Sequence, residues 1–245
     1  MEQYNNLCLD LSTLVTHRYS TSFTRGIKTL HKRFHKPIYA IYGFVRLADE
    51  IVDSFHEFDK KALLEEFKKD TWNAIDKKVS TNPILHAFQG IVNKYDIDRE
   101  LIESFLYSME LDLDKKSYDQ AFYEKYIYGS AEVVGLMCLR VFCEGNGSLY
   151  QQLIPPAKRL GAAFQKVNFL RDLKADFKEL GRVYFPGIDF TKFNNEAKKQ
   201  IEKDIDADFR AAYPGLMALP KDVRPGVYTA FIYYRELLSK IQKVP

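Results

Sequence analysis

The stretch PIYAIYGFVRLADEIVD, residues 37–53, is a helix-forming sequence that is apolar on nearly every side. Successive residues of a helix are turned by about 100°, and on that wheel the polar side chains share one narrow sector. These side chains are Tyr39, Tyr42, Arg46, Asp49 and Asp53. A helix that is apolar nearly all round is buried inside a protein. Its single polar sector is therefore expected to line an internal cavity.

Asp49 and Asp53 lie one helical turn apart in that sector. Two buried carboxylates at this separation repel each other and are costly to remove from water. A multivalent cation relieves both costs, and Mg²⁺ prefers oxygen ligands and commonly bridges to phosphate oxygens. From this pattern alone, a metal site and a buried network of ion pairs are both open interpretations.

A second segment, NFLRDLKADF at 168–177, repeats the polar spacing with Asn168, Asp172 and Asp176. The same sector of its helical wheel also contains Gly161 and Gln165. The basic residues on the far side are Arg171, Lys174 and Lys178, whereas Lys166 is an exception that projects from the apolar side. A solvated face would mix the basic residues among the acids. The separation indicates that these acids face inward, and two acid-bearing helices that face each other favour a site for a metal ion and a diphosphate.

The same spacing is interpreted differently elsewhere in the chain. Asp204 and Asp208 are also four residues apart, but charged neighbours crowd every side of their helix: Glu202, Lys203, Asp206 and Arg210. We expect this pair on a solvated surface. The acids in MELDLDKK are likewise expected at a helix surface or a helix end: Glu110, Asp112 and Asp114.

Helical periodicity dominates the remaining sequence, and strand alternation is almost absent. The predicted helices span 37–55, 60–79, 82–95, 98–115, 121–144, 155–179, 195–212 and 221–243. Hydrophobic residues make up 46% of the chain, which is enough for a sizeable core. No stretch resembles an interdomain linker, and no repeat of 20–50 residues is found. The prediction is one all-α domain over residues 1–245.

Composition limits the partners and the compartment. A net charge of +3 and the lack of a long basic run argue against a nucleic-acid partner. The three cysteines have no metal-ligand spacing, and reduced thiols in the cytoplasm are expected. The N-terminus does not have the pattern of a signal peptide. The most apolar stretch, AEVVGLMCLRVFC, is too short to span a bilayer. We expect a cytoplasmic protein that touches at most the inner membrane surface.

With these residues identified, the chain resembles the squalene/phytoene synthase family. The most specific segment is LGAAFQKVNFLRDLKADFKELGRVYFP, residues 160–186, which matches the family pattern of Leu-Gly, Gln, Asn, Arg-Asp, Asp and Arg-x-Tyr-x-Pro. Three further segments match in the right order: YSTSF (19–23), AIYGFVRLADEIVD (40–53) and YIYGSAEVVGLM (126–137). The resemblance covers nearly the whole chain and implies an isoprenoid-synthase-type helical bundle with a central active-site cavity.

The resemblance implies Mg²⁺-dependent, head-to-head condensation of two isoprenyl diphosphates through a cyclopropylcarbinyl diphosphate. We expect geranylgeranyl diphosphate as substrate and phytoene, a carotenoid precursor, as product. No nicotinamide cofactor is expected, because the chain is short and has no dinucleotide-binding glycine pattern. One alternative is squalene or dehydrosqualene synthesis from farnesyl diphosphate. Another is a non-catalytic relative that acts in assembly or lipid binding, although all four aspartates of the two pairs are retained. A head-to-tail chain-elongating synthase is disfavoured, since those enzymes use DDxxD-type motifs.

The resemblance also implies residue roles. The metal ligands, for Mg²⁺ or Mn²⁺, are Asp49, Asp53, Asn168, Asp172 and Asp176. The substrate-binding residues are Tyr19, Ser20, Thr21, Ser22, Phe23, Tyr42, Arg46, Gln165, Arg171, Arg182, Tyr184 and Tyr233. The catalytic residues are Tyr42, Asp49, Asp53, Tyr128, Arg171, Asp172 and Asp176. Arginine forks suit phosphate oxygens, and aromatic faces stabilise an allylic cation in a dry pocket. Further candidates for those faces are Tyr39 and Tyr126.

Three features depart from the family pattern. Many members have Lys at the position of Thr21, so one basic diphosphate contact has to come from elsewhere. Many members have Gly at the position of Glu132, where a carboxylate could alter the cavity or bind a ligand. The chain stops soon after its last helix, where relatives usually continue with a basic segment, so we treat the C-terminus as a possible truncation. The oligomeric state and the face for peripheral membrane contact, which product release would use, are left open.

Overall fold

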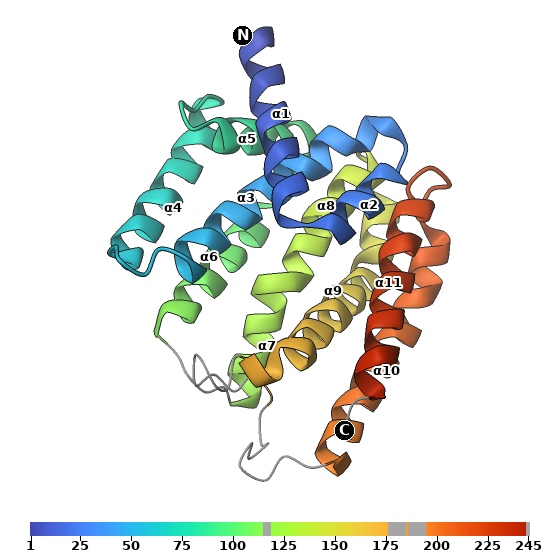
Figure 1. Ribbon diagram of the computed structural model, residues 1–245. Helices are drawn as coiled ribbons and strands as arrows, with labels where there is room; N and C mark the ends of the chain where they lie inside the picture. Colours follow the sequence, from blue (N-terminus) through green and yellow to red (C-terminus); the bar gives the residue numbers. More distant parts are fainter. Residues whose placement is uncertain (115–118, 176–184, 186–194, 244–245) are drawn as a thin grey trace.

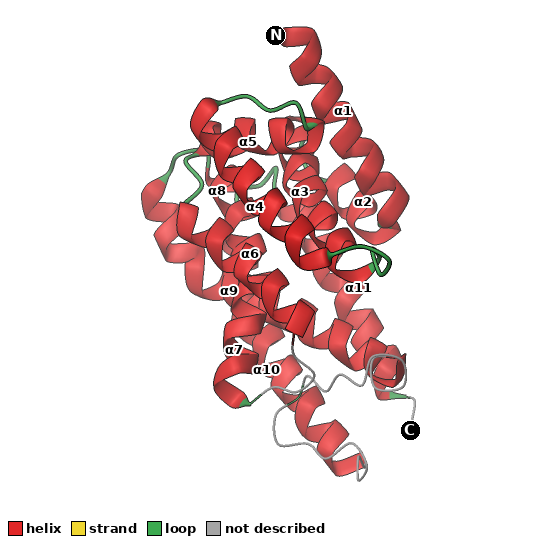
Figure 2. Ribbon diagram, turned by 90° about the vertical axis from the view of Figure 1, so that its left-hand side faces the viewer, coloured by secondary structure: helices red, strands yellow, loops and turns green. Residues whose placement is uncertain are grey.

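The computed structural model describes residues 1–114, 119–175, 185 and 195–243, and every regular element in that part of the chain is a helix (Figures 1 and 2). The helices are α1 (Glu2–Tyr19), α2 (Thr21–Lys28), the short 3-10 helix η1 (Lys32–Phe34), α3 (His35–Asp53), α4 (Lys60–Lys77), α5 (Pro83–Tyr95), α6 (Arg99–Asp114), α7 (Gln120–Ile127), the π-helical segment η2 (Tyr128–Glu132), α8 (Val133–Cys143), α9 (Gly147–Ala175), α10 (Asn195–Ala218) and α11 (Arg224–Gln242). The predicted all-α bundle is confirmed.

The helix that opened the sequence analysis is central in the fold. α3 packs against α1, α4, α5, α6 and α8. The Phe44 ring of α3 stacks on Phe88 of α5 with centroids 3.9 Å apart, and both side chains are completely buried. Ile41 and Ala48 are buried as well. The burial predicted from the apolar sides of this helix is confirmed.

The first two helices were not predicted, and α1 shows why. Its buried stripe consists of Cys8, Ser12 and Thr16, so the sequence carries no regular hydrophobic pattern. The hydroxyl of Ser12 donates to the Cys8 carbonyl at 3.1 Å, and that of Thr16 donates to the Ser12 carbonyl at 2.9 Å. A Cβ atom on Gly43 would lie 3.2 Å from the Ser12 side chain. Small residues at this contact let α1 pack closely on α3.

The long helix α9 begins at Gly147 rather than near residue 155, and it contains Pro155 and Pro156. Because a helix interior tolerates proline poorly, the sequence pattern favoured a helix that begins near Pro155. Pro156 is also the contact point for α10, because a Cβ atom on Gly215 would lie 2.2 Å from its ring. α9 packs against α8, η2, α10 and α11 and links the two halves of the bundle (Figure 1).

α7, η2 and α8 form one continuous helix over residues 120–143. By length and composition alone it could cross a membrane, contrary to the expectation from the shorter apolar stretch. It packs against α6 and α9, and 56% of its most apolar window is buried inside the protein. The core contacts therefore account for its apolar sequence.

Two acidic segments differ from the surface positions predicted for them. Asp208 is only 2% exposed, and it accepts from Lys166 Nζ at 2.7 Å and from Arg159 Nη1 at 2.9 Å. Asp112 is also buried and accepts from the Tyr126 hydroxyl at 2.6 Å. Asp204 is exposed as expected, and α6 ends at Asp114. The surface prediction was wrong for Asp208 and Asp112, because their partners come from other helices, which the charge pattern of one helix does not show.

Candidate active site

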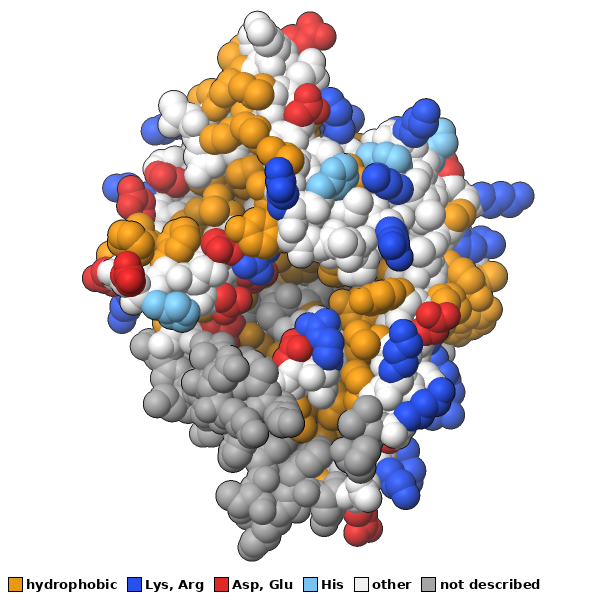
Figure 3. Space-filling model, viewed as in Figure 1, with side chains coloured by type: hydrophobic (Ala, Val, Ile, Leu, Met, Phe, Trp, Pro, Cys, Tyr) orange, Lys and Arg blue, Asp and Glu red, His pale blue; other side chains and the backbone are white. Residues whose placement is uncertain are grey.

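A cavity of about 610 Å³ lies between α2, α3, η2, α8, α9, α10 and α11, and it is visible from outside as a hollow (Figure 3). Along α3 its lining changes from Ile38 and Ile41 to Tyr42, Arg46 and Asp49. The same change from apolar to polar runs along α9: Leu153, Pro156, Ala157 and Leu160, followed by Gln165 and Asn168. The cavity thus has a polar part and a larger apolar part.

Asp49 is the predicted metal ligand that this cavity includes from α3. Burial and the neighbouring charge of Asp53 raise the pKa of Asp49 to about 7, although Arg46 opposes the shift. Within the described part of the chain, no side chain or backbone amide forms a hydrogen bond or ion pair with Asp49. Asp53 lies at the end of α3, where its side chain is exposed. Asp49 is therefore a candidate ligand for a cation.

Two polar side chains of α9 line the cavity, as the wheel predicted: Gln165 and Asn168. The Asn168 Oδ1 atom is buried and has no hydrogen-bond partner among the described residues. Asp172, one turn further on, is half-buried and accepts from Arg171 Nε at 2.8 Å and Nη2 at 2.6 Å. The wheel had placed Arg171 on the far side of the acids, but its long side chain reaches Asp172.

The arginine of α3 is also paired. Arg46 forms an ion pair with Glu50, and its guanidinium lies 4.4 Å above the ring of Tyr19. Arg46 lines the cavity, and its Nε atom is a second buried polar atom without a partner among the described residues. Both predicted phosphate-binding arginines that the structure describes therefore hold carboxylates, and each would change partner to hold a phosphate.

The start of α2 contributes the YSTSF segment. Ser20 caps the helix, since its Oγ accepts from the Phe23 amide at 3.2 Å, and it lies 3.3 Å from Ser22 Oγ. Thr21, Ser22 and Phe23 line the cavity. The free amides of a helix start favour an anion, so this end of α2 presents a partial positive charge to the polar part of the cavity.

Ser130 supplies a third unpaired polar group. Its Oγ is buried without a hydrogen-bond partner in the described chain, and it lines the cavity from the π-helical segment η2. Buried polar atoms in folded proteins are nearly always paired, and single π-helical turns are frequent at functional sites. Five such unpaired atoms are found among the described residues, and three of them belong to residues that line this one cavity: Arg46 Nε, Ser130 Oγ and Asn168 Oδ1.

The predicted aromatic residues divide into two groups. Tyr42 and Tyr233 line the cavity with Phe23, and the Phe23 and Tyr42 rings lie 5.6 Å apart. The lining described for this cavity does not include the others: Tyr39, Tyr126 and Tyr128. Tyr39 packs edge-on against His17, and Tyr128 lies 4.7 Å below the ammonium of Lys158. The hypothesis that these three rings face a cation in the cavity is not supported by their positions.

Residues 16–245 match the family model described as squalene/phytoene synthase. The chain belongs to the squalene/phytoene synthase family. It is 25% identical to the phytoene synthase of Arthrospira platensis over 96% of this chain and 84% of that one. It is 28% identical to the presqualene diphosphate synthase of Sinorhizobium fredii over 88% and 72% of the two chains. A dehydrosqualene synthase solved in complex with a ligand has the same fold, with a TM-score of 0.87 at 22% identity over 98% and 88% of the chains.

Members of the squalene/phytoene synthase family are prenyltransferases that join isoprenyl diphosphates head to head, and this chain is assigned to that enzyme class. The relatives are named for different products, so membership alone does not select one. In this family setting the polar part of the cavity is the candidate diphosphate end, and the apolar part is the candidate site for the isoprenyl chains.

The sequence analysis did not include several cavity residues among its site residues, and besides Ser130 these include Tyr234 and Arg25. Tyr234 is buried, stacks on Phe164 at 4.1 Å, and lies beside the Asn168 amide, while burial raises its pKa. The spacing of Phe231, Tyr234 and Leu238 marks the inward face of α11 and could have pointed to Tyr234 rather than Tyr233. Arg25, one turn into α2, also lines the cavity and offers a cation near the segment where Thr21 replaces lysine.

Glu132, the departure from the family pattern, forms an ion pair with a residue of α9. Its carboxylate is 3.5 Å from the ammonium of Lys158, and the cavity lining does not include it. Three predicted residues lie outside the described part of the chain: Asp176, Arg182 and Tyr184. Within the described part, no group of three or more His, Cys, Asp or Glu side chains is arranged to hold a metal ion. A cation at Asp49 would therefore need ligands from the substrate and water too.

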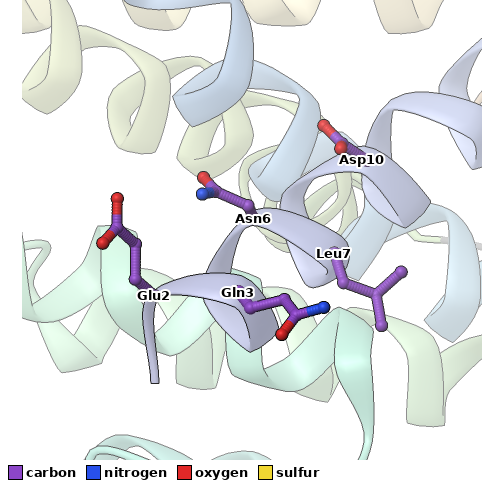
Figure 4. Close-up of a pocket in the computed structure, with 5 residues that line it drawn as sticks. All are labelled: Glu2, Gln3, Asn6, Leu7 and Asp10. Atoms are coloured by element: carbon purple, nitrogen blue, oxygen red, sulfur yellow. The ribbon is translucent and has the colours of Figure 1, made fainter.

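A shallow depression lies on the surface of α1 (Figure 4). Its wall is a single face of α1, and its side chains are all exposed: Glu2, Gln3, Asn6, Leu7 and Asp10. A shallow surface made by one helix offers neither enclosure nor converging polar groups, which ligand sites normally have. We assign no site there.

Proposed function

We propose that this protein condenses two molecules of geranylgeranyl diphosphate head to head to give phytoene, with Mg²⁺ as the metal and without a nicotinamide cofactor. The observation that carries the proposal is the set of unpaired buried groups on Arg46, Ser130 and Asn168, in the wall of a cavity whose remaining lining is mostly apolar. A diphosphate joined to a long hydrocarbon chain satisfies both kinds of wall.

The donor set of the polar part fits Mg²⁺. Asp49 is a carboxylate whose pKa is raised by burial and by the nearby charge of Asp53, and Asn168 Oδ1 is an oxygen without a partner among the described residues. Hard oxygen donors of this kind are the ligands that Mg²⁺ takes, usually together with phosphate oxygens and water. We assign the metal to Asp49, Asp53, Asn168, Asp172 and Asp176. When bound there, the ion would neutralise the charge on the departing diphosphate.

The residues of the chain supply the remaining contacts to the diphosphate. Arg46 and Arg171 would exchange Glu50 and Asp172 for phosphate oxygens, since a guanidinium fork binds both kinds of anion. Asp172 would then be released to join the metal site. The amides at the start of α2 add donors for an anion. Ser130 Oγ is free to donate its proton to an oxygen of the substrate.

The apolar lining suits the carbocation that is left when diphosphate departs. Tyr42, Phe23 and Tyr234 line the cavity, and aromatic faces stabilise a cation where water is excluded. Burial raises the pKa of Tyr42, so its hydroxyl stays protonated and is a poor nucleophile near the cation. The released diphosphate can accept the proton that leaves.

Two observations support a long substrate. The apolar part of the cavity follows α8 as far as Phe142, and the helix rises about 18 Å from Ser130 to that residue. The phytoene synthase of Arthrospira platensis also matches more of both chains than the presqualene diphosphate synthase does. A chain of four isoprene units would occupy this length more completely than one of three.

The proposal is tested by incubating the purified protein with farnesyl or geranylgeranyl diphosphate, with Mg²⁺, Mn²⁺ or chelator, and with or without NADPH. We expect phytoene from geranylgeranyl diphosphate, dependent on the divalent ion and indifferent to NADPH. If the protein turned over farnesyl diphosphate and not geranylgeranyl diphosphate, the assigned product would be squalene or dehydrosqualene instead of phytoene. Lack of turnover with either substrate, despite tight binding of a lipid, would favour a non-catalytic role in lipid binding or assembly.

A further inference from the structure

Apolar side chains are exposed on three neighbouring helices. On α11 these are Tyr228 and Ile232, which are 41% and 37% exposed. On α10 they are Tyr213 and Met217, at 44% and 40%, and on α2 it is Phe23. Scattered exposed apolar residues are normal, but a contiguous patch of them marks an interaction site. The question is whether these residues form one surface.

The exposed apolar residues form one surface because α2 and α10 both pack against α11. The rings of Tyr213 and Tyr228 both pack on the ring of Phe231, with centroid distances of 5.8 and 6.3 Å. α2 lies beside α11, where the Thr29 hydroxyl donates to the Thr229 hydroxyl at 3.3 Å. We call this surface the α2/α10/α11 face. Figure 3 shows hydrophobic side chains beside the hollow and at the edge of the molecule over α10 and α11, with Lys and Arg among them.

The cavity opens on this face. Phe23, Ile232 and Tyr233 line the cavity and are also exposed at the surface, so they form its rim. The rim thus joins the apolar interior of the cavity to the exposed apolar residues outside. A hydrocarbon chain that leaves the cavity here would pass from one apolar environment to the next.

The same face is rich in cations. Arg25 and Lys28 on α2, Arg210 on α10 and Lys240 on α11 are exposed, and none of the four forms an ion pair with a described residue. Glu236 is the carboxylate at the cavity rim. Cations that are not neutralised by the protein, set around exposed tyrosines, match the charge of an anionic lipid surface.

We propose that the α2/α10/α11 face docks on an anionic lipid bilayer, so that the cavity opens toward the membrane. This inference rests on the proposed function, because substrates and products with long isoprenyl chains partition into lipid. Tyrosine suits the boundary between lipid headgroups and hydrocarbon, where its ring is apolar and its hydroxyl remains hydrated. A second copy related by a two-fold axis would bring like charges together, which disfavours a dimer at this face.

The test is sedimentation of the full chain, without substrate, with vesicles of phosphatidylcholine alone or mixed with phosphatidylglycerol. We expect binding to the mixed vesicles that weakens as salt is added. The double variant Lys28→Glu/Arg210→Glu should bind them at least about 10-fold more weakly, since each basic residue near an anionic surface contributes to the affinity. The variant Tyr228→Ser/Met217→Ser should also lose binding, and its loss should persist at low salt.

Matched controls alter the same residue types elsewhere on the surface. Leu14→Ser removes an exposed apolar side chain from α1, and Lys61→Glu reverses an exposed charge on α4. Both should bind vesicles like the wild type. Equal losses in these controls, or wild-type binding by both variants of the face, would overturn the proposal. A concentration-dependent dimer that Tyr228→Ser/Met217→Ser dissociates would identify a second copy as the occupant instead.

Failure of the docking face is distinguishable from failure of the proposed function. None of the four substituted positions lines the cavity, so turnover of detergent-dispersed substrate should be unchanged in both variants. Vesicle binding without turnover would contradict the proposed function alone. Turnover in detergent without vesicle binding would contradict the docking face alone.

Discussion

Asp49 on α3 and Asp208 on α10 belong to pairs of acids with the same spacing, but their surroundings differ. Asp208 is buried against Lys166 and Arg159, which the protein itself supplies. Asp49 lies in the cavity wall with a pKa raised to about 7, and no described residue forms an ion pair with it. The spacing is therefore uninformative by itself. At Asp208 the compensating cations are side chains of the protein, which is typical of a structural ion-pair network. At Asp49 no described side chain forms an ion pair, which makes this residue a candidate metal ligand.

The largest effect is expected from Asp49→Asn. The substitution removes a charged oxygen donor from the candidate metal site but keeps the size of the side chain. Turnover of the isoprenyl diphosphate should fall by about 10³-fold, comparable to the loss of one strong transition-state contact. The helical circular dichroism spectrum should stay as in the wild type. Turnover within a few-fold of the wild type would refute the role of Asp49.

Asp208→Asn is expected to lower the stability of the fold and to leave turnover unchanged, the reverse of Asp49→Asn. This change leaves the buried ammonium of Lys166 with only the more exposed Asp204, and breaking a buried pair costs about 3–5 kcal/mol. Denaturant unfolding should show that loss, while turnover per folded molecule stays near the wild-type value. A large loss of turnover in a fully folded variant would mean that the two pairs do not differ in the proposed way.

The pH dependence of stability sharpens the contrast. In the metal-free protein the folded state opposes ionisation of Asp49, so its pKa lies above the unfolded value of 3.8. The folded state therefore loses stability as pH rises from about 4 to about 7. Thermal unfolding over this range should show a smaller decline in Asp49→Asn than in the wild type. Parallel curves for the two proteins would contradict the assigned shift.

The smallest effect is expected from Asp204→Asn. Asp204 is the solvent-exposed partner of Lys166, whose ammonium retains Asp208 after the change. Exposed members of ion pairs contribute about 0–1 kcal/mol to stability. Both unfolding and turnover should therefore stay close to the wild type, as measured by urea titration and the substrate assay. A loss as large as that of Asp208→Asn would show that the network acts as one unit.

Much of the fold followed from the sequence because α3 carries apolar residues on nearly all sides and one polar sector. Gln165 and Asn168 were placed in the cavity by the same reasoning. α1 was missed because Cys8, Ser12 and Thr16 give its buried stripe no hydrophobic pattern. The burial of Asp208 was missed because its cationic partners lie on α9. Contacts between distant helices are not encoded in the periodicity of either helix.

The aromatic residues illustrate the same limit. Tyr39 shares a helical sector with Tyr42, yet Tyr39 packs against His17 on α1, a helix that the periodicity did not reveal. Tyr234 was overlooked beside Tyr233, although its spacing to Phe231 and Leu238 marks the buried face of α11. A helical wheel predicts the direction in which a side chain points, whereas the neighbouring helix determines which residues that side chain contacts.

The most direct test of the central claim is calorimetric binding of a non-ionising thiodiphosphate analogue of geranylgeranyl diphosphate, with and without Mg²⁺. Binding by the wild type should depend strongly on Mg²⁺. This dependence should disappear in Asp49→Asn and Asp172→Asn but persist in Asp204→Asn. Equal affinity with and without Mg²⁺, or an unchanged Mg²⁺ dependence in both Asp49→Asn and Asp172→Asn, would contradict the assignment of the metal–diphosphate site to α3 and α9.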